Sequence, residues 1–407
     1  MKLTRLLSFA VIFIFISATI YMTNMGGLQR PLLVLGLGMI LISIFLVKTE
    51  ALKYNVHATS IFILFIGACL FATIKNADVE LGIGALLLLI IFIALTIVLP
   101  TLYKGDYVAF IAKCILIAHV PFILVSMVVD NFTASPFSGV FYTGNALGSV
   151  TATIYCVILA KFGYTLENVL FSKVGKYRSL LGYLLLLSAL LYLTIMSGSR
   201  TSALTVILIS FTLVGLMFIR ALYIKKLRFI HFLKLSLYGL IIVPVFFIIN
   251  IFIPLIEMFN QVIIGKFMLK QNDILDLRGI VWEQTFEKAG LFGGGRDFFV
   301  TETVAAALNT FISILGQYGW VALVLFSIYT IMSIYYGLKY MVSKNSKEYR
   351  YLPILMVTLF ILLSTAESMM LKSSMLAFIA LTGYVQFVIL KESKVVDSKK
   401  IVLQGTD

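Results

Sequence analysis

Two arginines, Arg200 and Arg278, occupy positions where an anionic ligand would explain a positive charge. Arg200 follows Ser197-Gly198-Ser199 and opens an apolar segment. The free N–H groups at a helix start favour anions, and a guanidinium adds a planar, permanently charged fork that matches phosphate oxygens. The alternative for Arg200 is an anchor whose side chain extends to the lipid headgroups.

Arg278 belongs to the polar sequence LDLRGIVWEQTFEKAGLFGGGRDFF, in which residues 274–289 have the pattern of a helix. Its acidic and apolar side chains fall on opposite faces: Asp276, Glu283 and Glu287 on one, and Leu275, Arg278, Trp282 and Ala289 on the other. A charge on an apolar face is costly unless it meets a partner or a ligand. Both an ion pair and a ligand-facing role are open for Arg278.

Two further segments carry small or polar residues suited to close contact with a substrate. Gly293-Gly294-Gly295-Arg296 allows close backbone approach or simply a turn, and it lacks the Lys-Ser/Thr ending of a nucleotide-binding loop. The connector 137–146 contains Gly139, Asn145 and several aromatic residues. Its side chains could stack on a sugar, although aromatic residues also gather at membrane interfaces without any catalytic role.

Carboxylates are the candidates for proton transfer. Glu302 and Asn309 are seven residues apart and would share one face of a helix, and Glu367 lies near the end of an apolar segment. A carboxylate with a pKa raised by burial can take a proton from an attacking hydroxyl. The sequence shows no cluster of His, Cys and carboxylate residues with metal-ligand spacing. We therefore expect a site that needs neither a metal ion nor a cofactor.

The composition places these residues on membrane-spanning helices. The chain of 407 residues is 61% hydrophobic and only 12% charged, with a mean hydropathy of +1.06. Continuous apolar runs of about 17–25 residues are long enough to cross a bilayer as α-helices, whereas β-barrel strands would alternate with a period of two. The net charge of +14 is spread through connectors, which argues against nucleic-acid binding. We predict an all-α, polytopic membrane protein.

The pattern predicts about twelve transmembrane helices in a single domain, 1–407, with an extracytoplasmic insertion at about 257–317. The predicted spans are 6–22, 31–47, 58–74, 81–102, 108–129, 144–161, 179–196, 202–221, 232–256, 318–338, 351–367 and 374–391. Lys and Arg concentrate in alternate connectors, which places both termini in the cytoplasm. The first helix is expected to stay uncleaved, and the three cysteines, all within apolar spans, are expected to be packing residues.

Between about residue 137 and residue 330, the chain carries a series of polar motifs that are placed around one large predicted outer loop. They are Gly139 and Asn145 before a span, Ser199-Arg200 opening another, Arg278-x-x-x-Trp282, Gly293-x-Gly295, and Asn309 followed by Gly316 and Gly319. This series resembles the O-antigen polymerase and ligase superfamily of bacterial envelope glycosyltransferases. The first 130 residues match that superfamily only as generic membrane helices.

The resemblance implies a glycosyltransferase of the C-type fold in the cytoplasmic membrane, acting without metal on undecaprenyl-diphosphate-linked saccharides. It places Arg200 and Arg278 on the diphosphate, and we add Arg296 to them. Gly139, Asn145 and Trp282 are expected to contact substrate, and Glu302, Glu367 and Asn309 are expected to be catalytic. Water is the alternative route for the proton.

The family's ligases carry a histidine before the asparagine that corresponds to Asn309, whereas this chain has Leu308 there. That difference favours a polymerase of surface polysaccharide, such as capsule, exopolysaccharide or teichuronic acid, over a ligase-like transferase. A polysaccharide transporter or flippase is the alternative from another class. The expected partners are the lipid-linked donor and acceptor, the bilayer, chain-length regulators and flippase proteins.

Overall fold

The computed structural model describes residues 2–47, 52–129, 136–172, 177–223, 257, 274–344 and 346–404, and this part of the chain is all-α. The first half contains α1 (Lys2–Ile20), η1 (Gly26–Leu28), α2 (Gln29–Phe45), α3 (Val56–Lys75), α4 (Val79–Ile93), η2 (Ala94–Val98), α5 (Leu99–Leu102), α6 (Tyr107–Val129) and α7 (Gly144–Ser172). The second half contains α8 (Tyr177–Met196), α9 (Arg200–Tyr223), α13 (Ile274–Lys288), α14 (Phe298–Thr301), α15 (Thr310–Val342), α16 (Leu352–Ser364) and α17 (Ser373–Gln404).

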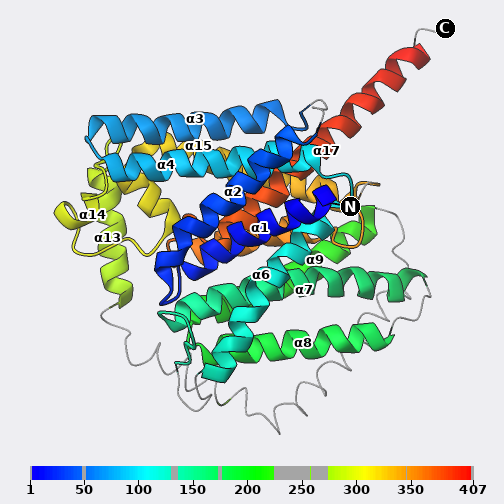
Figure 1. Ribbon diagram of the computed structural model, residues 1–407, viewed down its shortest axis with the longest axis horizontal. Helices are drawn as coiled ribbons and strands as arrows, with labels where there is room; N and C mark the ends of the chain where they lie inside the picture. Colours follow the sequence, from blue (N-terminus) through cyan, green and yellow to red (C-terminus); the bar gives the residue numbers. More distant parts are fainter. Residues whose placement is uncertain are drawn as a thin grey trace.

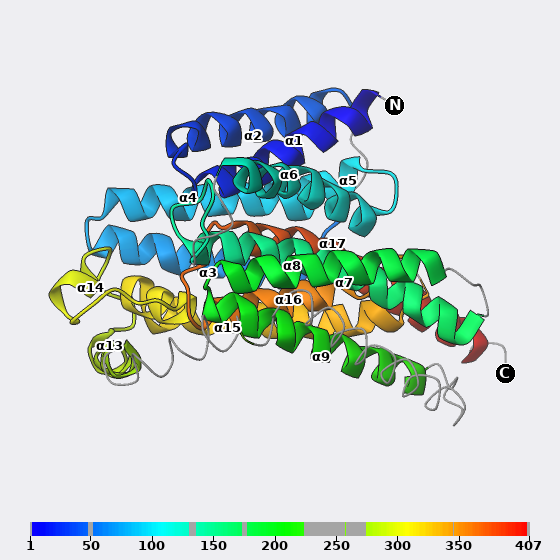
Figure 2. The ribbon, with the colours of Figure 1, turned by 90° about the horizontal axis from the view of Figure 1, so that it is seen from below.

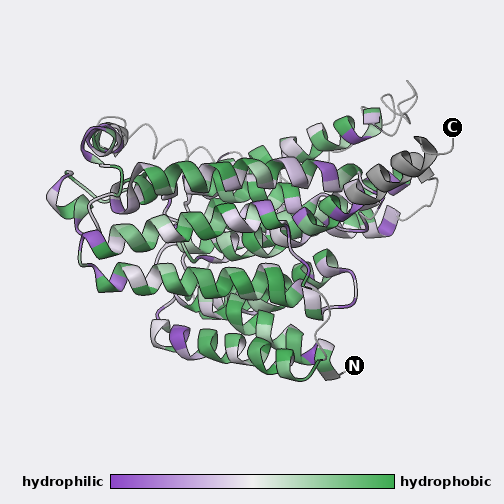
Figure 3. Cartoon of the chain, turned by 90° about the horizontal axis from the view of Figure 1, so that it is seen from above, coloured by the Kyte–Doolittle hydropathy of each residue, from purple (hydrophilic) through white to green (hydrophobic). Residues whose placement is uncertain are grey.

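Ten of the described helical segments are long and apolar enough to cross a membrane, so the protein is a multi-pass membrane protein. Apolar residues run along the helices, whereas hydrophilic ones concentrate near the helix ends and on α13 (Figure 3). The predicted span 232–256 lies outside the described residues. Each other predicted span overlaps a helix, but α16, with 13 residues, is too short to count among the candidate spans.

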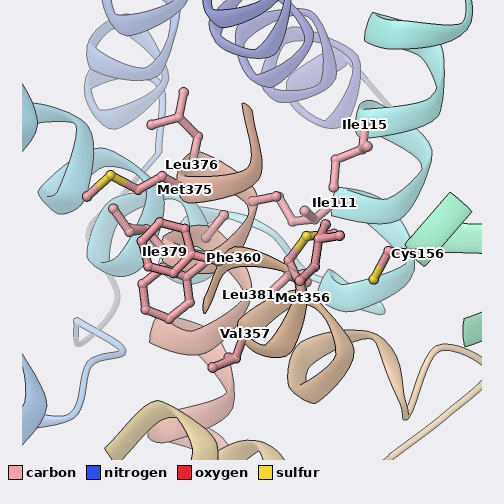
Figure 4. Packing of buried hydrophobic residues seen from close by; sticks show 14 of the residues in the cluster. Ile111, Ile115, Cys156, Met356, Val357, Phe360, Met375, Leu376, Ile379 and Leu381 are labelled. Carbon is pink, nitrogen blue, oxygen red and sulfur yellow. The ribbon is translucent and has the colours of Figure 1, made fainter. Parts of the chain in front are cut away.

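The centre of the bundle is formed by α16 and α17, which pack on each other and on α7. Side chains from α6, α7, α16 and α17 meet there (Figure 4), and Phe360 stacks on Phe378 with ring centroids 4.8 Å apart. Aromatic pairs of this kind add to the energy of apolar burial. The three cysteines are buried and free, as expected of packing residues.

The two ends of the bundle differ in what they carry. The short turns α1–α2, α3–α4 and α8–α9 lie at the same end as α13 and α14, which we call the loop end (Figures 1 and 2). The start of α1 and the end of α17 lie at the opposite end, which we call the terminal end. At the loop end, α13 lies across the bundle rather than along it (Figure 1). Its bounds, Ile274–Lys288, confirm the helix predicted over 274–289.

The predicted helical face shared by Glu302 and Asn309 is wrong. Glu302 is the C-cap of the four-residue helix α14, and the residues that follow it are not helical. Asn309 begins a separate helix, because its side chain accepts hydrogen bonds from the N–H groups of Phe311 (2.8 Å) and Ile312 (3.2 Å). The helix α15 therefore starts before the predicted span 318–338.

Candidate functional site

A carboxylate enclosed by polar partners lies at the loop end, in the connector between α16 and α17. Asn145, near the start of α7, donates from Nδ2 to Oε1 of Glu367 at 2.7 Å. Lys372 Nζ lies 3.9 Å from Oε2 of the same carboxylate. The side chains of Glu367 and Lys372 are only 16% and 21% exposed, so this ion pair is partly shielded from water.

The start of α15 holds the connector in place. Thr310 Oγ1 donates to the carbonyl oxygen of Glu367 (3.1 Å) and accepts from the N–H of Met369 (2.9 Å). Asn309 Nδ2 donates to the carbonyl oxygen of Thr365 at 3.2 Å. Asn309 is thus bound to backbone on both sides and positions the connector, and its expected catalytic role stays a prediction.

Burial and neighbouring charges change the pKa values of Glu367 and Lys372 in opposite directions. Burial raises the pKa of Glu367, while the charges of Lys372 and Arg278 and the hydrogen bond from Asn145 lower it. Burial likewise lowers the pKa of Lys372, and the Glu367 carboxylate opposes that change. A carboxylate held in this balance suits proton transfer, because its basicity exceeds that of an ordinary exposed glutamate.

Arg278, on α13, acts on the site through its charge. The face predicted to turn away from water does so, because Val281, Thr285 and Ala289 are buried whereas Glu283 and Glu287 are exposed. Trp282, one turn after Arg278, packs beside the small apolar cluster of Val281, Ala307 and Ile312.

Within the described residues, Arg278 Nε is buried and has no hydrogen-bond acceptor. A buried donor without an acceptor carries a desolvation cost. The charge of Arg278 is close enough to Glu367 to lower the pKa of that carboxyl. The guanidinium therefore has a donor available for an anionic group at the loop end.

The turn that opens α9 carries Arg200 and packs against the start of α7. A Cβ on Gly144 would lie 1.9 Å from the carbonyl oxygen of Ser197, and one on Gly148 would lie 2.8 Å from Cβ of Ser199. Only glycines allow the two helix starts to approach so closely. This packing places the turn before Arg200 beside the helix that carries Asn145.

Gly139 is a structural residue. Its φ of +57° is one that glycine adopts readily, and an added Cβ would lie 2.2 Å from Cβ of Ser126 in α6. Ser126 also accepts a hydrogen bond from the N–H of Val140 at 3.2 Å. Packing and backbone conformation are therefore sufficient reasons for a glycine at this position, and the expected contact between Gly139 and substrate stays a prediction.

The glycine run docks on α15 rather than forming an open anion-binding loop. Gly294 N donates to the carbonyl oxygen of Gly316 at 2.9 Å. Gly319 breaks the helix with φ +88°, and a Cβ there would lie 2.3 Å from Gly293 N. The two glycine pairs of the sequence therefore form one interlocked backbone contact, which we call the glycine interlock (residues 290–295 with 316–321).

The remaining predicted ligands pair with charges of their own. Arg296 forms an ion pair with Glu80, and its N–H donates to Oδ2 of Asp78 at 2.8 Å, which ties the loop to the α3–α4 turn. Glu302 is 46% exposed and lies 3.5 Å from Lys288 Nζ. Neither residue contacts Glu367 through a hydrogen bond or ion pair of the described structure.

Lys372 and Thr310 are the members of the site that sequence reasoning missed. Lys372 is one of few basic residues in the connectors predicted to lie outside, and it follows Glu367 by five residues. Those two facts together could have identified Lys372 as a candidate site residue. Thr310 carries no comparable signal, since a threonine after a capping asparagine is common at helix starts.

A small cavity of about 140 Å³ lies behind the connector, between α3, α4 and α15. Ser313, Gln317 and Ser368 line it together with apolar residues. It is large enough for a few waters but smaller than pockets that enclose a ligand, which span about 300–1,000 Å³. Among the described residues, no three His, Cys, Asp or Glu side chains are grouped so that they could hold a metal ion.

A scan against protein-family models found no match, and a search of curated proteins found none either.

Proposed function

We propose that the protein is a membrane glycosyltransferase that joins lipid-diphosphate-linked saccharide units into a surface polysaccharide. The observation that carries the proposal is the contact of Glu367 with Asn145 and Lys372 at the loop end, with the charge of Arg278 near enough to lower the pKa of the Glu367 carboxyl. The site combines a partly buried carboxylate with a nearby guanidinium that has an unused donor. Those are the groups that a hydroxyl nucleophile and a diphosphate leaving group require.

In the proposed reaction, an acceptor sugar hydroxyl attacks the anomeric carbon of the donor. Its proton passes to Glu367, the new glycosidic bond forms, and the bond to the polyprenyl diphosphate breaks with its electron pair on the phosphate oxygen. Arg278 and Arg200 neutralise the charge that develops on the leaving diphosphate. Asn145 and Lys372 hold the Glu367 carboxylate in place.

The resemblance to the O-antigen polymerase and ligase superfamily supports the substrate class, because Arg200 and Arg278 stand at the positions expected to bind diphosphate. A fold of the C-type and an outer-leaflet location for the loop end belong to the same proposal. Leu308, in place of the ligase histidine, favours polymerisation over transfer of a finished glycan.

The proposal is tested by deleting the gene and complementing the deletion with wild type, Glu367→Gln or Glu302→Gln. Surface polysaccharide and lipid-linked intermediates are then sized by electrophoresis. We expect Glu367→Gln to accumulate single lipid-linked units at normal protein level, and Glu302→Gln to restore long polymer. Long chains left on the carrier lipid in the deletion strain would identify a ligase, and intermediates trapped on the cytoplasmic side would identify a transporter.

A further inference from the structure

A basic cavity of about 1060 Å³ opens at the terminal end of the bundle, away from the site around Glu367. It lies between the turn that joins α5 to α6, the end of α15 and the middle of α17. Its charged lining is Lys53, Lys104, Lys344, Lys347, Lys391 and Glu392. Five lysines against one glutamate leave an excess of four positive charges around one concave surface.

Among the described residues, two carboxylates lie at or beside the cavity. Each accepts a hydrogen bond but keeps its negative charge, so the five lysines still outnumber the two carboxylates by three. Ser343 Oγ donates to Oε1 of Glu392 at 2.8 Å. Asp106, in the adjoining turn, caps α6 by accepting from the N–H of Ala109 at 3.1 Å. Like charges gathered in this way repel one another, and an anion that enters the cavity relieves the repulsion. The lining therefore favours a negatively charged ligand.

The rest of the lining is apolar or aromatic. Pro100, Val342, Phe387 and Val388 supply aliphatic and aromatic surface, and Tyr103, Tyr223 and Tyr384 are also present. Two of these tyrosines are firmly packed, with the Tyr103 ring 4.2 Å from Phe110 and the Tyr384 ring 4.7 Å from Tyr107. Tyrosine is typical of the headgroup level of a membrane, where one end of its ring is apolar and the other is hydrated.

We propose that this cavity binds the phosphate headgroup of an anionic phospholipid from the leaflet at the terminal end. The lysines match the phosphodiester, and the apolar lining matches the glycerol and the first acyl carbons. Basic pockets between transmembrane helices bind anionic lipid headgroups in this manner. A small hydrophilic anion would use the ammonium groups but would leave the apolar lining without a partner. This inference does not depend on the proposed function.

The test uses full-length protein purified in a non-ionic detergent. Its Tm is followed while phosphatidylglycerol, phosphatidylcholine or inorganic phosphate is added at matched concentrations. A ligand that binds only the folded state raises Tm with concentration. We expect phosphatidylglycerol to raise Tm in a saturable manner, and the other two to leave it within error.

Two matched variants distinguish lipid binding by the lysines of the cavity from lipid binding by positive charge elsewhere on the surface. Lys104→Gln/Lys391→Gln removes two lining charges, and Arg178→Gln/Lys339→Gln removes two exposed basic residues that do not line the cavity. We expect the first pair to weaken phosphatidylglycerol binding at least tenfold, with a Tm before lipid is added that is equal to that of wild type or higher, and the control pair to bind as wild type does.

Three outcomes would overturn the proposal. An equal response to inorganic phosphate would show that a soluble anion, not a lipid, occupies the cavity. An equal response to phosphatidylcholine would show general lipid binding to the apolar surface. Equal losses in the two variant pairs would show that charge anywhere at this end suffices. If Lys104→Gln/Lys391→Gln fails to fold, Lys347→Gln tests the same cavity with one exposed side chain changed.

Discussion

At the scale of single residues, the site depends on Glu367, whose pKa is raised by burial and lowered by neighbouring positive charges. Burial alone would leave Glu367 protonated over a wider pH range and unable to accept a proton. Lys372 and Arg278 lower its pKa and so extend the range in which it is ionised. Under the proposed function, the same two cations also attract the diphosphate of the substrate, so that the proton acceptor and the anion-binding groups influence one another.

Replacing Lys372 with methionine tests this balance. Glu367 must be ionised to act as a base, so activity rises with pH through its pKa. Removing the Lys372 charge raises that pKa, and we expect the acidic limb of the pH–rate profile to move to higher pH. The measurement is polymerisation of lipid-linked substrate by purified protein across a pH series.

Lys288→Met is the matched control, because Lys288 pairs with the exposed Glu302 at the same end of the molecule. Its acidic limb should coincide with that of wild type. An unmoved limb in Lys372→Met would show that Glu367 is not the titrating base.

Arg278 is expected to act on the leaving group. Removing a donor that stabilises developing negative charge costs about 10²–10³-fold in kcat. We expect a loss of this size in Arg278→Ala and a smaller one in Arg278→Lys, which keeps the charge but not the planar fork. Steady-state kinetics on purified protein measure both.

Arg296→Gln serves as the comparison for Arg278. Its guanidinium is 60% exposed and already paired with Glu80, and exposed ion pairs contribute about 0–1 kcal/mol to stability. We expect kcat within a few-fold of wild type. A loss as large as that of Arg278→Ala would place Arg296 among the diphosphate ligands as well.

At the scale of elements, the glycine interlock sets where α13 lies. The loop after α13 binds α15 through backbone hydrogen bonds on both sides of the break at Gly319. Side chains larger than hydrogen would force these backbones apart. The position of Arg278 over the bundle therefore depends on glycines far from it in sequence.

Gly319→Ala is expected to displace the loop. The substitution combines a left-handed backbone conformation, which costs about 1–3 kcal/mol, with a Cβ 2.3 Å from Gly293 N. We expect a lower Tm, faster proteolysis between α13 and α15, and a loss of activity similar to that of Arg278→Ala.

Gly67→Ala is the control, because its Cβ would meet nothing within 4 Å and α3 is regular there. Alanine is the better helix former by about 1 kcal/mol, so Tm should stay equal or rise. A Gly319→Ala protein with wild-type Tm and proteolysis would contradict the interlock.

At the scale of the whole molecule, a buried ion cluster joins α7, α9 and the segment before α16 near the terminal end. Glu167 lies 3.0 Å from Arg220 Nε and 3.4 Å from Arg350 Nη1, and it accepts a hydrogen bond from Tyr351 at 2.8 Å. These side chains are at most 14% exposed. The cluster holds together helices whose other ends carry Asn145 and Arg200.

Glu167→Ala leaves two arginines without their shared carboxylate. Breaking a buried pair by removing one partner costs about 3–5 kcal/mol, so we expect a large fall in Tm. Glu348→Ala removes a 51% exposed partner of Lys161 and should cost about 0–1 kcal/mol. Equal Tm values for the two variants would mean that the cluster contributes little.

The sidedness of the bundle gives a further prediction. If the loop end faces outward, a cysteine in place of Val300, whose side chain is 82% exposed, should react with a membrane-impermeant maleimide in intact cells. A cysteine at Lys344, at the terminal end, should react only after permeabilisation. The native cysteines are buried and give little background. The reverse pattern would invert the topology.

Particular residues show why part of the fold could be predicted from the sequence. Apolar runs long enough to cross a bilayer leave helices as the only way to satisfy the backbone, so fold class followed from composition and length. The helix over 274–289 and its buried face followed from periodicity. The prediction of a helix over 302–309 is wrong because the Asn309 side chain caps the start of α15. A side chain that bonds to nearby backbone N–H groups in this way favours the start of a new helix over the continuation of an earlier one.

The amino-acid sequence by itself determined that this is an all-α membrane protein, and it singled out Arg278, Asn145 and Glu367 as separate candidates. Only the tertiary structure brought Asn145 and Glu367 into hydrogen-bond contact across 222 residues of chain, added Lys372, and paired Arg296 and Glu302 with other charges. The physical reason is that periodicity and composition act over a few helical turns. Contacts between helices depend instead on packing, here on glycines that let α7 meet the turn before α9 and the loop after α13 meet α15.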